Sequence, residues 1–298
     1  MKSFKECVPC ILRQVEEIGS RLFARDEGKK KAIIDEASRI LKGADVTSMT
    51  PPEATTLVHH AVSKLTGIRD FYKDIKEKDN KFAMSIYPEL ETIVRKSDDP
   101  LLTAIKLSIA GNVIDYGAHQ TFDVNATINE VFDQEFMIND YEKFKKDLSR
   151  SKKILYIGDN AGEIVFDKLL VSEIGKMGKK VIFAVKSKPI LNDSLLEDAE
   201  SVEMTKMADV IESGSDTAGT VLSKTTDEFK KVYQEADMVI AKGQGNFETI
   251  EDQGKNIYFL LKCKCMHLSR RLKCAQGAII LVNNSNKDYL DFLKEPVC

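Results

Sequence analysis

The stretch "KILYIGDNAGEIVFDKLL", residues 153–170, decides the fold. It begins with a short apolar run and passes through a turn in which an acid and an amide stand between Gly158 and Gly162. It then continues at helical spacing, which predicts an amphipathic helix with Ile164 and Met177 on its apolar side. A buried strand that turns directly into a helix is the repeating unit of a parallel sheet.

Short apolar runs of similar composition recur along the second half of the chain, with helical stretches between them. The predicted strands are residues 153–158, 180–185, 236–243, 256–262 and 278–283, with 201–206 as a weaker sixth. Strands with little polar alternation are buried on both faces, and helical connections between them are right-handed crossovers. We therefore expect an α/β protein with a three-layer α/β/α, Rossmann-like domain and a mostly parallel sheet, in which ligands bind outside the carboxyl ends of the strands.

The first half of the chain has a different pattern, with helical periodicity and hardly a strand candidate. One predicted helix starts after Thr50, has two prolines in its first turn and stops at Gly67. Residues 139–153 form a charged connector to the second half. The prediction is an all-helical domain over residues 1–150 that caps the site and an α/β domain over residues 151–298.

Composition narrows the class of protein. The 298 residues are 43% hydrophobic and 31% charged, with a net charge of −3, which is typical of a globular protein. No apolar run has the length of a bilayer span, and the start of the chain lacks the apolar core of a signal peptide, so we expect a cytoplasmic protein. Interspersed charges predict no nucleic-acid and no membrane partner, and favour a small molecule. Oligomeric state stays open.

Six cysteines raise the question of disulfides or metal. A chain of this size without a secretory signal has no need of disulfides, so reduced thiols are expected. "CVPC", with Cys7 and Cys10, resembles half of a metal knuckle, but the spacing of Cys263, Cys265 and Cys274 is not that of a zinc ribbon. Small buried hydrophobes are the favoured interpretation, with a redox or metal role for the first pair left open.

Hard oxygen donors follow two of the predicted strands. Asp159 and Asn160 come directly after the first, and Asp193 lies beyond the second. Carboxylate and amide oxygens suit Mg²⁺ or Mn²⁺, ions that are shared with substrate phosphate. Each of these residues is also common in ordinary turns and helix caps, but their joint placement at strand ends favours a site.

Phosphate-binding features follow other strands. Lys242, Gly243 and Gly245 stand where the run 236–243 ends, and the loop 212–220 is dense in Ser, Thr and Gly, including Thr217 and Gly219. A lysine supplies positive charge, and glycines let backbone amides approach a phosphate. Together with the oxygen donors, these features predict hydrolysis of a phosphomonoester assisted by a metal. Neither a dinucleotide fingerprint nor a Walker A loop is present.

An otherwise apolar helical segment carries Asn112 and Asp115, three residues apart and therefore on one face. Buried polar groups need partners. We favour the interpretation that this face caps the site between the two domains, while a hydrogen-bonded pair between helices is the alternative.

Several motifs in a fixed order resemble a known family: "CVPC", "GNVIDYG", "GDNAGEIVFDKLL", "LNDSLLEDA", "SGSDTAGT" and "KGQGNFET". They are similar to the damage-control phosphatases, metal-dependent enzymes long known only as a domain of unknown function, and in particular to the microbial subfamily with an N-terminal Cys-x-x-Cys. The resemblance covers nearly the whole chain. Family members hydrolyse phosphate esters of small metabolites, including sugar phosphates and damaged phosphometabolites.

The resemblance also implies residue roles. Asp159, Asn160 and Asp193 would hold a divalent ion (Mn²⁺, Mg²⁺, Co²⁺ or Ni²⁺) and serve catalysis. The phosphate would be held by Lys242, Gly243, Gly245 and Asn246, with Asn112 and Asp115 near the metal. Glu163 is expected to face the new helix rather than the site.

Two mechanisms are open at this point: Asp159 as a nucleophile through a phospho-enzyme, or a water activated by the metal. We favour the water, because the Asp-x-Asp signature of aspartyl-nucleophile phosphatases is absent. Two other functions compete with the phosphatase: a non-catalytic sensor of a nucleotide or phosphometabolite, and a protein carboxyl methyltransferase.

Overall fold

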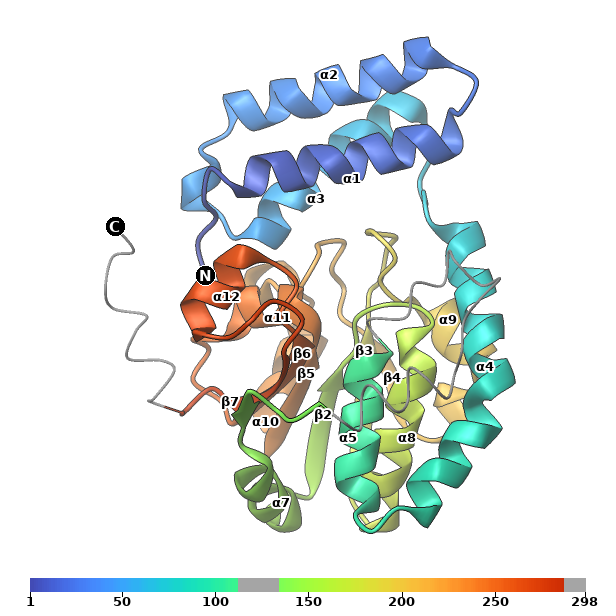
Figure 1. Ribbon diagram of the computed structural model, residues 1–298, viewed down its shortest axis with the longest axis vertical. Coiled ribbons are helices and arrows are strands. Elements are labelled where there is room, and N and C mark those ends of the chain that lie inside the picture. Colours follow the sequence, from blue (N-terminus) through green and yellow to red (C-terminus); the bar gives the residue numbers. More distant parts are fainter. Residues whose placement is uncertain (112–133, 287–298) are drawn as a thin grey trace.

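The structure, a computed structural model, describes residues 1–111 and 134–286 and places a helical lobe over the carboxyl ends of a sheet (Figure 1). The lobe contains α1 (Cys7–Leu22), α2 (Glu27–Gly43) and α3 (Pro51–Thr66). Helix α3 begins and ends as the sequence predicts. Thr50 and Glu53 form a capping box at its start, and Gly67, with φ of 73°, ends it in the left-handed conformation.

The sheet has seven strands in the described residues, in the order β1-β7-β6-β5-β2-β3-β4. They are β1 (Ile138–Asn139), β2 (Lys153–Ile157), β3 (Lys180–Val185), β4 (Asp209–Glu212), β5 (Met238–Lys242), β6 (Ile257–Lys262) and β7 (Ile279–Asn283). Neighbouring strands are parallel except for the pair β6 and β7. The expected α/β class with a mostly parallel sheet is confirmed, and the five main predicted strands are all present.

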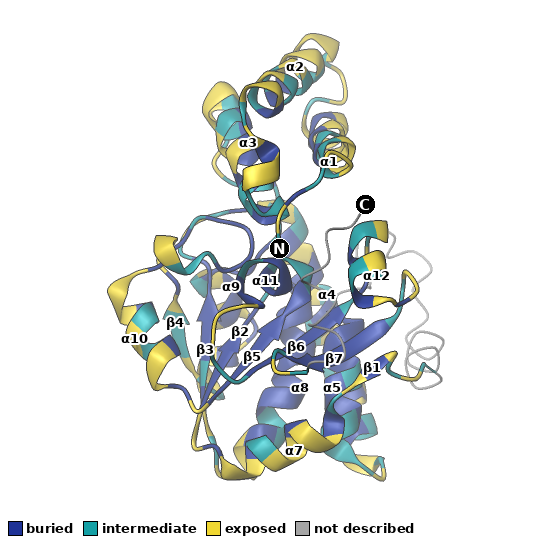
Figure 2. Ribbon diagram, turned by 90° about the vertical axis from the view of Figure 1, so that its left-hand side faces the viewer, coloured by how far each residue is buried: buried dark blue, intermediate teal, exposed yellow. Residues whose placement is uncertain are grey.

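Helices cover both faces of the sheet, so that the strands are buried on either side (Figure 2). One face carries α4 (Lys73–Lys96), α5 (Pro100–Ala110), α7 (Tyr141–Arg150), α8 (Glu163–Lys176) and α9 (Leu196–Ser201). The other carries α10 (Asp227–Glu235), α11 (Gly243–Ile250) and α12 (Met266–Leu272). Successive strand residues point to opposite faces, which is why Tyr156 packs in the first core and Ile157 in the second.

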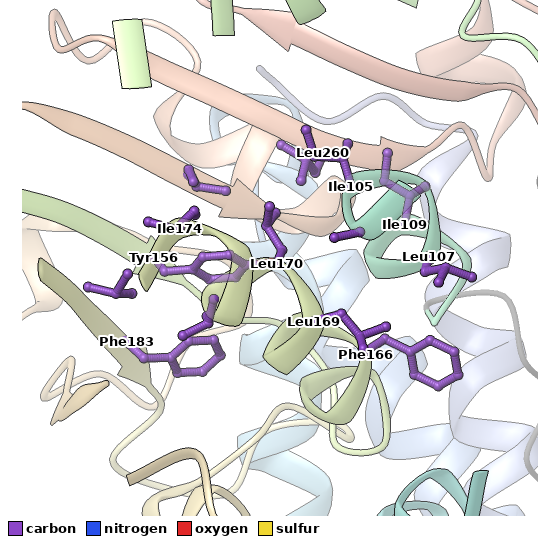
Figure 3. Close-up of a cluster of buried hydrophobic side chains, with 14 of the residues drawn as sticks. Ile105, Leu107, Ile109, Tyr156, Phe166, Leu169, Leu170, Ile174, Phe183 and Leu260 are labelled. Carbon is purple, nitrogen blue, oxygen red and sulfur yellow. The ribbon is translucent and has the colours of Figure 1, made fainter. Parts of the chain in front are cut away.

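Helix α8 lies deeper than its sequence indicates. We expected an amphipathic helix with Met177 on its apolar side, yet residues 161–171 are all buried and Met177 is exposed. The reason is that α4 and α5 pack on the outer side of α8 while the sheet covers its inner side. Figure 3 shows side chains of α5, α8 and the strands in this core. In this core Tyr156 and Phe183 stack with ring centroids 5.1 Å apart.

One prediction of local structure is wrong. The weak strand 201–206 is the end of α9 followed by a 3₁₀ turn, Met204–Lys206, and the strand is the short edge strand β4 just beyond it. Val202 and Met204 are apolar because they pack into the core beside α8. The connector 139–153 is mostly helix α7, whose buried residues stand three and four apart at helical spacing.

The lobe has an apolar core of its own, formed between α1, α2 and α3 around Ile11, Ile33 and Val58. Helices α4, α5 and α7 instead share the core of the sheet. The predicted division of the chain at residue 150 stays a prediction. Among the described residues, no helix combines the length and apolar character needed to cross a bilayer.

Candidate functional site

Backbone hydrogen bonds join the two loops that carry the predicted oxygen donors. Ala161 N donates to Asn192 O (2.9 Å), and Ser194 N donates to Asp159 O (2.8 Å). Asn160 and Asp193 face each other in an isolated antiparallel bridge. The loops follow the adjacent strands β2 and β3, so the carboxyl ends of these strands bring Asp159, Asn160 and Asp193 together as the sequence predicts.

The two carboxyl groups lie where their charge is poorly solvated. Burial, together with the charges of Asp193 and Glu163, raises the pKa of Asp159 to about 8. Burial also raises the pKa of Asp193 to about 6, against the opposing charge of Lys186. Asp193 Oδ2 has no hydrogen-bond partner among the described residues, and Lys186 Nζ lies 3.6 Å from it. A cation at this position would offset both charges.

The side chains of Asp159 and Asp193 suit a hard ion only if the amide oxygen of Asn160 is a further ligand. Within residues 1–111 and 134–286, no three His, Cys, Asp or Glu side chains are arranged as metal ligands, so a divalent ion at this position would need the amide of Asn160 beside the two carboxyl groups. Its Nδ2 donates to Glu163 Oε2 and to Asp159 Oδ2, each at 3.1 Å. The carbonyl oxygen of Asn160 is therefore the atom available to a cation, and two carboxylates with one amide oxygen fit Mg²⁺ or Mn²⁺ chemistry.

Lys242 lies behind these residues rather than among them. It is fully buried, and its Nζ donates to Ser108 O (2.8 Å), Glu163 Oε1 (2.6 Å) and Asp167 Oδ1 (2.6 Å). An ammonium group has three protons, and these three acceptors use them all. Lys242 therefore fixes Glu163, which in turn orients Asn160.

Glu163 is a residue that the sequence analysis assigned to the wrong surroundings. It starts α8 and contacts both Lys242 and Asn160 instead of facing only its own helix. The sequence does contain a signal of the contact between Asn160 and Glu163, because their spacing is that of a capping box. In the structure Asn160 N lies 3.5 Å from Glu163 Oε2.

The other predicted phosphate residues divide into two groups. Gly219 and Gly245 line the cavity described below. Gly243 and Asn246 support the loops: a Cβ on Gly243 would lie 1.9 Å from Asp159 Oδ2, and Asn246 Nδ2 donates to Lys242 O (2.7 Å). Thr217 is buried, and its hydroxyl contacts that of Ser215 at 2.6 Å. Asn112 and Asp115 lie outside the described residues.

A further network ties the two loops to α4. Gly162 N donates to Asn80 Oδ1 (2.7 Å), and Asn80 Nδ2 donates to Asp198 Oδ1 (2.9 Å). Asp198 also accepts from Leu195 N (2.9 Å), two residues after Asp193. Asn80 thus connects the loop of Asp159 to the loop of Asp193 through buried, satisfied hydrogen bonds.

A cavity of about 450 Å³ lies between the helical lobe and the strand ends, with Asp159, Asn160 and Asp193 in its wall. Lys264 belongs to the same wall, and its charge acts to lower the pKa of Asp159. No sequence motif marks Lys264, because it follows β6 in a cysteine-rich segment without a glycine motif. Its exposed ammonium group is suited to meeting an anion.

Comparison with known proteins gives the family. A model described as the damage-control phosphatase ARMT1-like domain matches residues 3–280. The chain belongs to this family. It is 37% identical to an uncharacterised protein of Methanocaldococcus jannaschii, over 93% of this chain and 94% of that one.

Two further relatives carry an activity in their names. The chain is 34% identical to a damage-control phosphatase of Archaeoglobus fulgidus, over 94% of this chain and 98% of the relative. It is 31% identical to a damage-control phosphatase of Pyrococcus horikoshii, over 96% of this chain and 100% of the relative. A crystal structure of a DUF89 family protein from the same organism matches with a TM-score of 0.88 at 31% identity, covering 95% of this chain and 99% of that one. The family expected from the sequence motifs is confirmed.

Proposed function

We propose that this chain is a divalent-metal-dependent phosphatase that hydrolyses phosphomonoesters of small metabolites, with sugar phosphates and damaged phosphometabolites as the substrate class. The observation that carries the proposal is the meeting of Asp159, Asn160 and Asp193 in the wall of one cavity with Lys264. Relatives named damage-control phosphatases, similar over nearly their whole length, support it.

Asp159, Asn160 and Asp193 would hold the divalent ion, for which Mg²⁺, Mn²⁺, Co²⁺ and Ni²⁺ are the candidates. The bound ion would supply positive charge to the phosphoryl oxygens as a Lewis acid. Two carboxyl groups with raised pKa values support this choice, as does the buried Asp193 Oδ2, which has no hydrogen-bond partner in the described residues. A nearby cation would stabilise the charged form of both groups.

The cations of the chain have different tasks in this proposal. Lys264, exposed to the cavity, binds the phosphate, a role that the sequence analysis gave to Lys242. Lys242 holds Glu163 and Asp167, and Lys186, which donates to Gly219 O, keeps the loop 212–220 against Asp193. The organic part of the substrate lies against the helical lobe, where the cavity volume falls in the range of small-molecule sites.

The direct test is phosphate release from an aryl phosphate and a panel of sugar phosphates. The protein is first treated with a chelator, and Mg²⁺, Mn²⁺, Co²⁺ or Ni²⁺ is then added back separately. We expect turnover only with metal, and a fall in kcat of roughly a hundredfold or more in Asp193→Asn, with weaker metal binding by calorimetry. Asp209→Asn is the matched control, because Asp209 pairs with Lys180 on the exposed edge of the sheet.

Equal turnover in Asp193→Asn and Asp209→Asn would show that the assigned site is wrong. Tight retention of a phosphometabolite without phosphate release would favour the sensor instead. Binding of a methyl donor by the chelated protein would favour the methyltransferase.

A further inference from the structure

Three cysteine thiols, those of Cys7, Cys10 and Cys265, line the same cavity as Asp159. Cys7 and Cys10 stand one turn apart at the start of α1, in the helical lobe. Cys265 is the N-cap residue of α12, on the sheet. The cavity wall therefore carries thiols from both parts of the molecule, which sequence spacing alone did not show.

These thiols differ from the other described cysteines in their access to solvent. Cys10 is exposed, and Cys7 and Cys265 are half-buried, whereas Cys263 and Cys274 are buried in the core of the sheet. A small reagent that enters the cavity can reach the first three and not the last two.

The three thiols also lie near enough to influence one another. Burial raises the pKa of Cys7, and Glu248, Cys265 and Cys10 raise it further. The pKa of Cys10 is likewise raised, by burial first, with Cys265 among the other causes. Cys265 thus acts on both thiols of α1. Because raised pKa values keep Cys7 and Cys10 protonated at neutral pH, their reaction with an oxidant is slow and needs an excess of it.

Disulfide chemistry fits this group better than metal binding. Three thiolates would be a strong site for zinc, but no three Cys, His, Asp or Glu side chains in the described part of the chain are arranged to hold an ion. Thiols that two packed parts contribute to one cavity can instead be joined by a disulfide and separated again by reduction.

We propose that Cys10 and Cys265 form a thiol–disulfide site in the cavity wall whose reaction partner is a small-molecule disulfide. The sulfur of Cys10, as thiolate, attacks one sulfur of the reagent, whose S–S bond breaks to release one thiol and leave a mixed disulfide. Cys265 then attacks the Cys10 sulfur and releases the second thiol. The two protein thiols are oxidised to one disulfide, and the reagent is reduced to two thiols.

This bond has a consequence for the cavity. It joins α1 of the lobe to the start of α12, which lies below α1 in Figure 1. The two cysteines belong to the wall of the cavity that also contains Asp159, Asn160 and Asp193. The oxidised protein holds its lobe closed, and substrate enters and product leaves slowly. This consequence rests on the proposed phosphatase function, whereas the disulfide itself does not.

The experiment uses the full chain with Cys298→Ser, because Cys298 lies outside the described residues. The protein is treated with excess oxidised glutathione, and its disulfides are mapped by peptide mass spectrometry before and after dithiothreitol. Phosphate release is measured on the same samples. We expect a linked pair of peptides containing Cys10 and Cys265 and at least a tenfold loss of turnover, both reversed by dithiothreitol.

Cys10→Ser and Cys265→Ser are each compared with their own untreated samples, and both should keep their turnover in oxidised glutathione. Cys274→Ala, which removes a buried thiol outside the cavity, should respond as the parent does. A map without the linked peptides, or zinc bound with the three thiols protected, would overturn the proposal. If the linked peptides form in a protein that releases no phosphate under any condition, the thiol site stands and the phosphatase function falls.

Discussion

Two segments at neighbouring strand ends share a sequence pattern but differ in what their side chains do. The Asp–Asn segment, residues 158–163, follows β2, and the Lys–Asn segment, residues 242–246, begins at the end of β5. Both combine glycines with an amide close to the start of a helix. The first places Asp159 and Asn160 in the cavity wall, whereas the second buries Lys242 and Asn246 completely.

The difference arises from what lies next to each segment. Glu163 and Asp167 of α8 accept from Lys242. The backbone carbonyls of Gly158, just after β2, and of Lys242, at the end of β5, accept from Asn246. A glycine and amide pattern therefore marks a strand end without saying whether its side chains meet a ligand or support the residues that do.

The largest effect is expected from Lys242→Met. This change leaves Glu163 and Asp167 buried without their cation, and breaking a buried pair in this way costs about 3–5 kcal/mol. Urea unfolding of the chelated protein measures the loss of free energy of unfolding. Lys264→Met is the matched control: it should change the stability by less than about 0.5 kcal/mol but lower kcat/KM at least tenfold. If Lys264→Met lowers the stability and Lys242→Met lowers only kcat/KM, the two lysines have the opposite roles.

Glu248 is expected to make the stability depend on pH. It lies in α11, two residues after the Lys–Asn segment. Burial raises the pKa of Glu248 to about 7, although Gln244 Nε2 donates to its Oε1 (2.7 Å). The folded state keeps this proton where the unfolded chain has lost it, so the stability contributed is full below about 4.5 and is lost as pH rises through about 7. Between pH 5 and 8 the parent should lose up to about 3 kcal/mol relative to Glu248→Gln. Parallel pH profiles of the two proteins would contradict the prediction.

The two glycines of the Lys–Asn segment should differ when replaced. Gly243 has φ of +78° and its added Cβ would lie 1.9 Å from Asp159 Oδ2, so Gly243→Ala should cost about 2 kcal/mol and weaken metal binding. A Cβ added to Gly245 would have no neighbouring atom closer than 3.4 Å, so Gly245→Ala should cost under about 1 kcal/mol. Chemical unfolding and metal titration of both variants give the comparison, and equal losses would show that the contact with Asp159 does not determine the cost.

The sequence predicted the parts of the site that depend on strand order alone. Asp159, Asn160 and Asp193 follow adjacent strands, so their meeting follows from the rule that ligands bind at the carboxyl ends of strands. The roles of Lys242 and Lys264 depend on which of them is buried. Helix α8 decides that by supplying the carboxylates of Glu163 and Asp167 to Lys242, a contact between residues more than 70 positions apart in the chain. The part of the cavity wall formed by α1 depends on the position of the helical lobe over the sheet. The residue pattern of α1 itself does not encode that position.

The smallest effect is expected where α4 supports the Asp–Asn segment from outside. Asn80→Ala removes the acceptor for Gly162 N and a donor to Asp198, and the groups left unsatisfied should cost about 1–2 kcal/mol. Because both loops lose a shared support, metal affinity should also fall roughly tenfold, as outer partners of metal ligands typically cause. Ser85→Ala on the exposed side of α4 is the control and should change neither quantity measurably. If Asn80→Ala lowers stability while metal affinity stays unchanged, Asn80 holds the fold together without positioning the site.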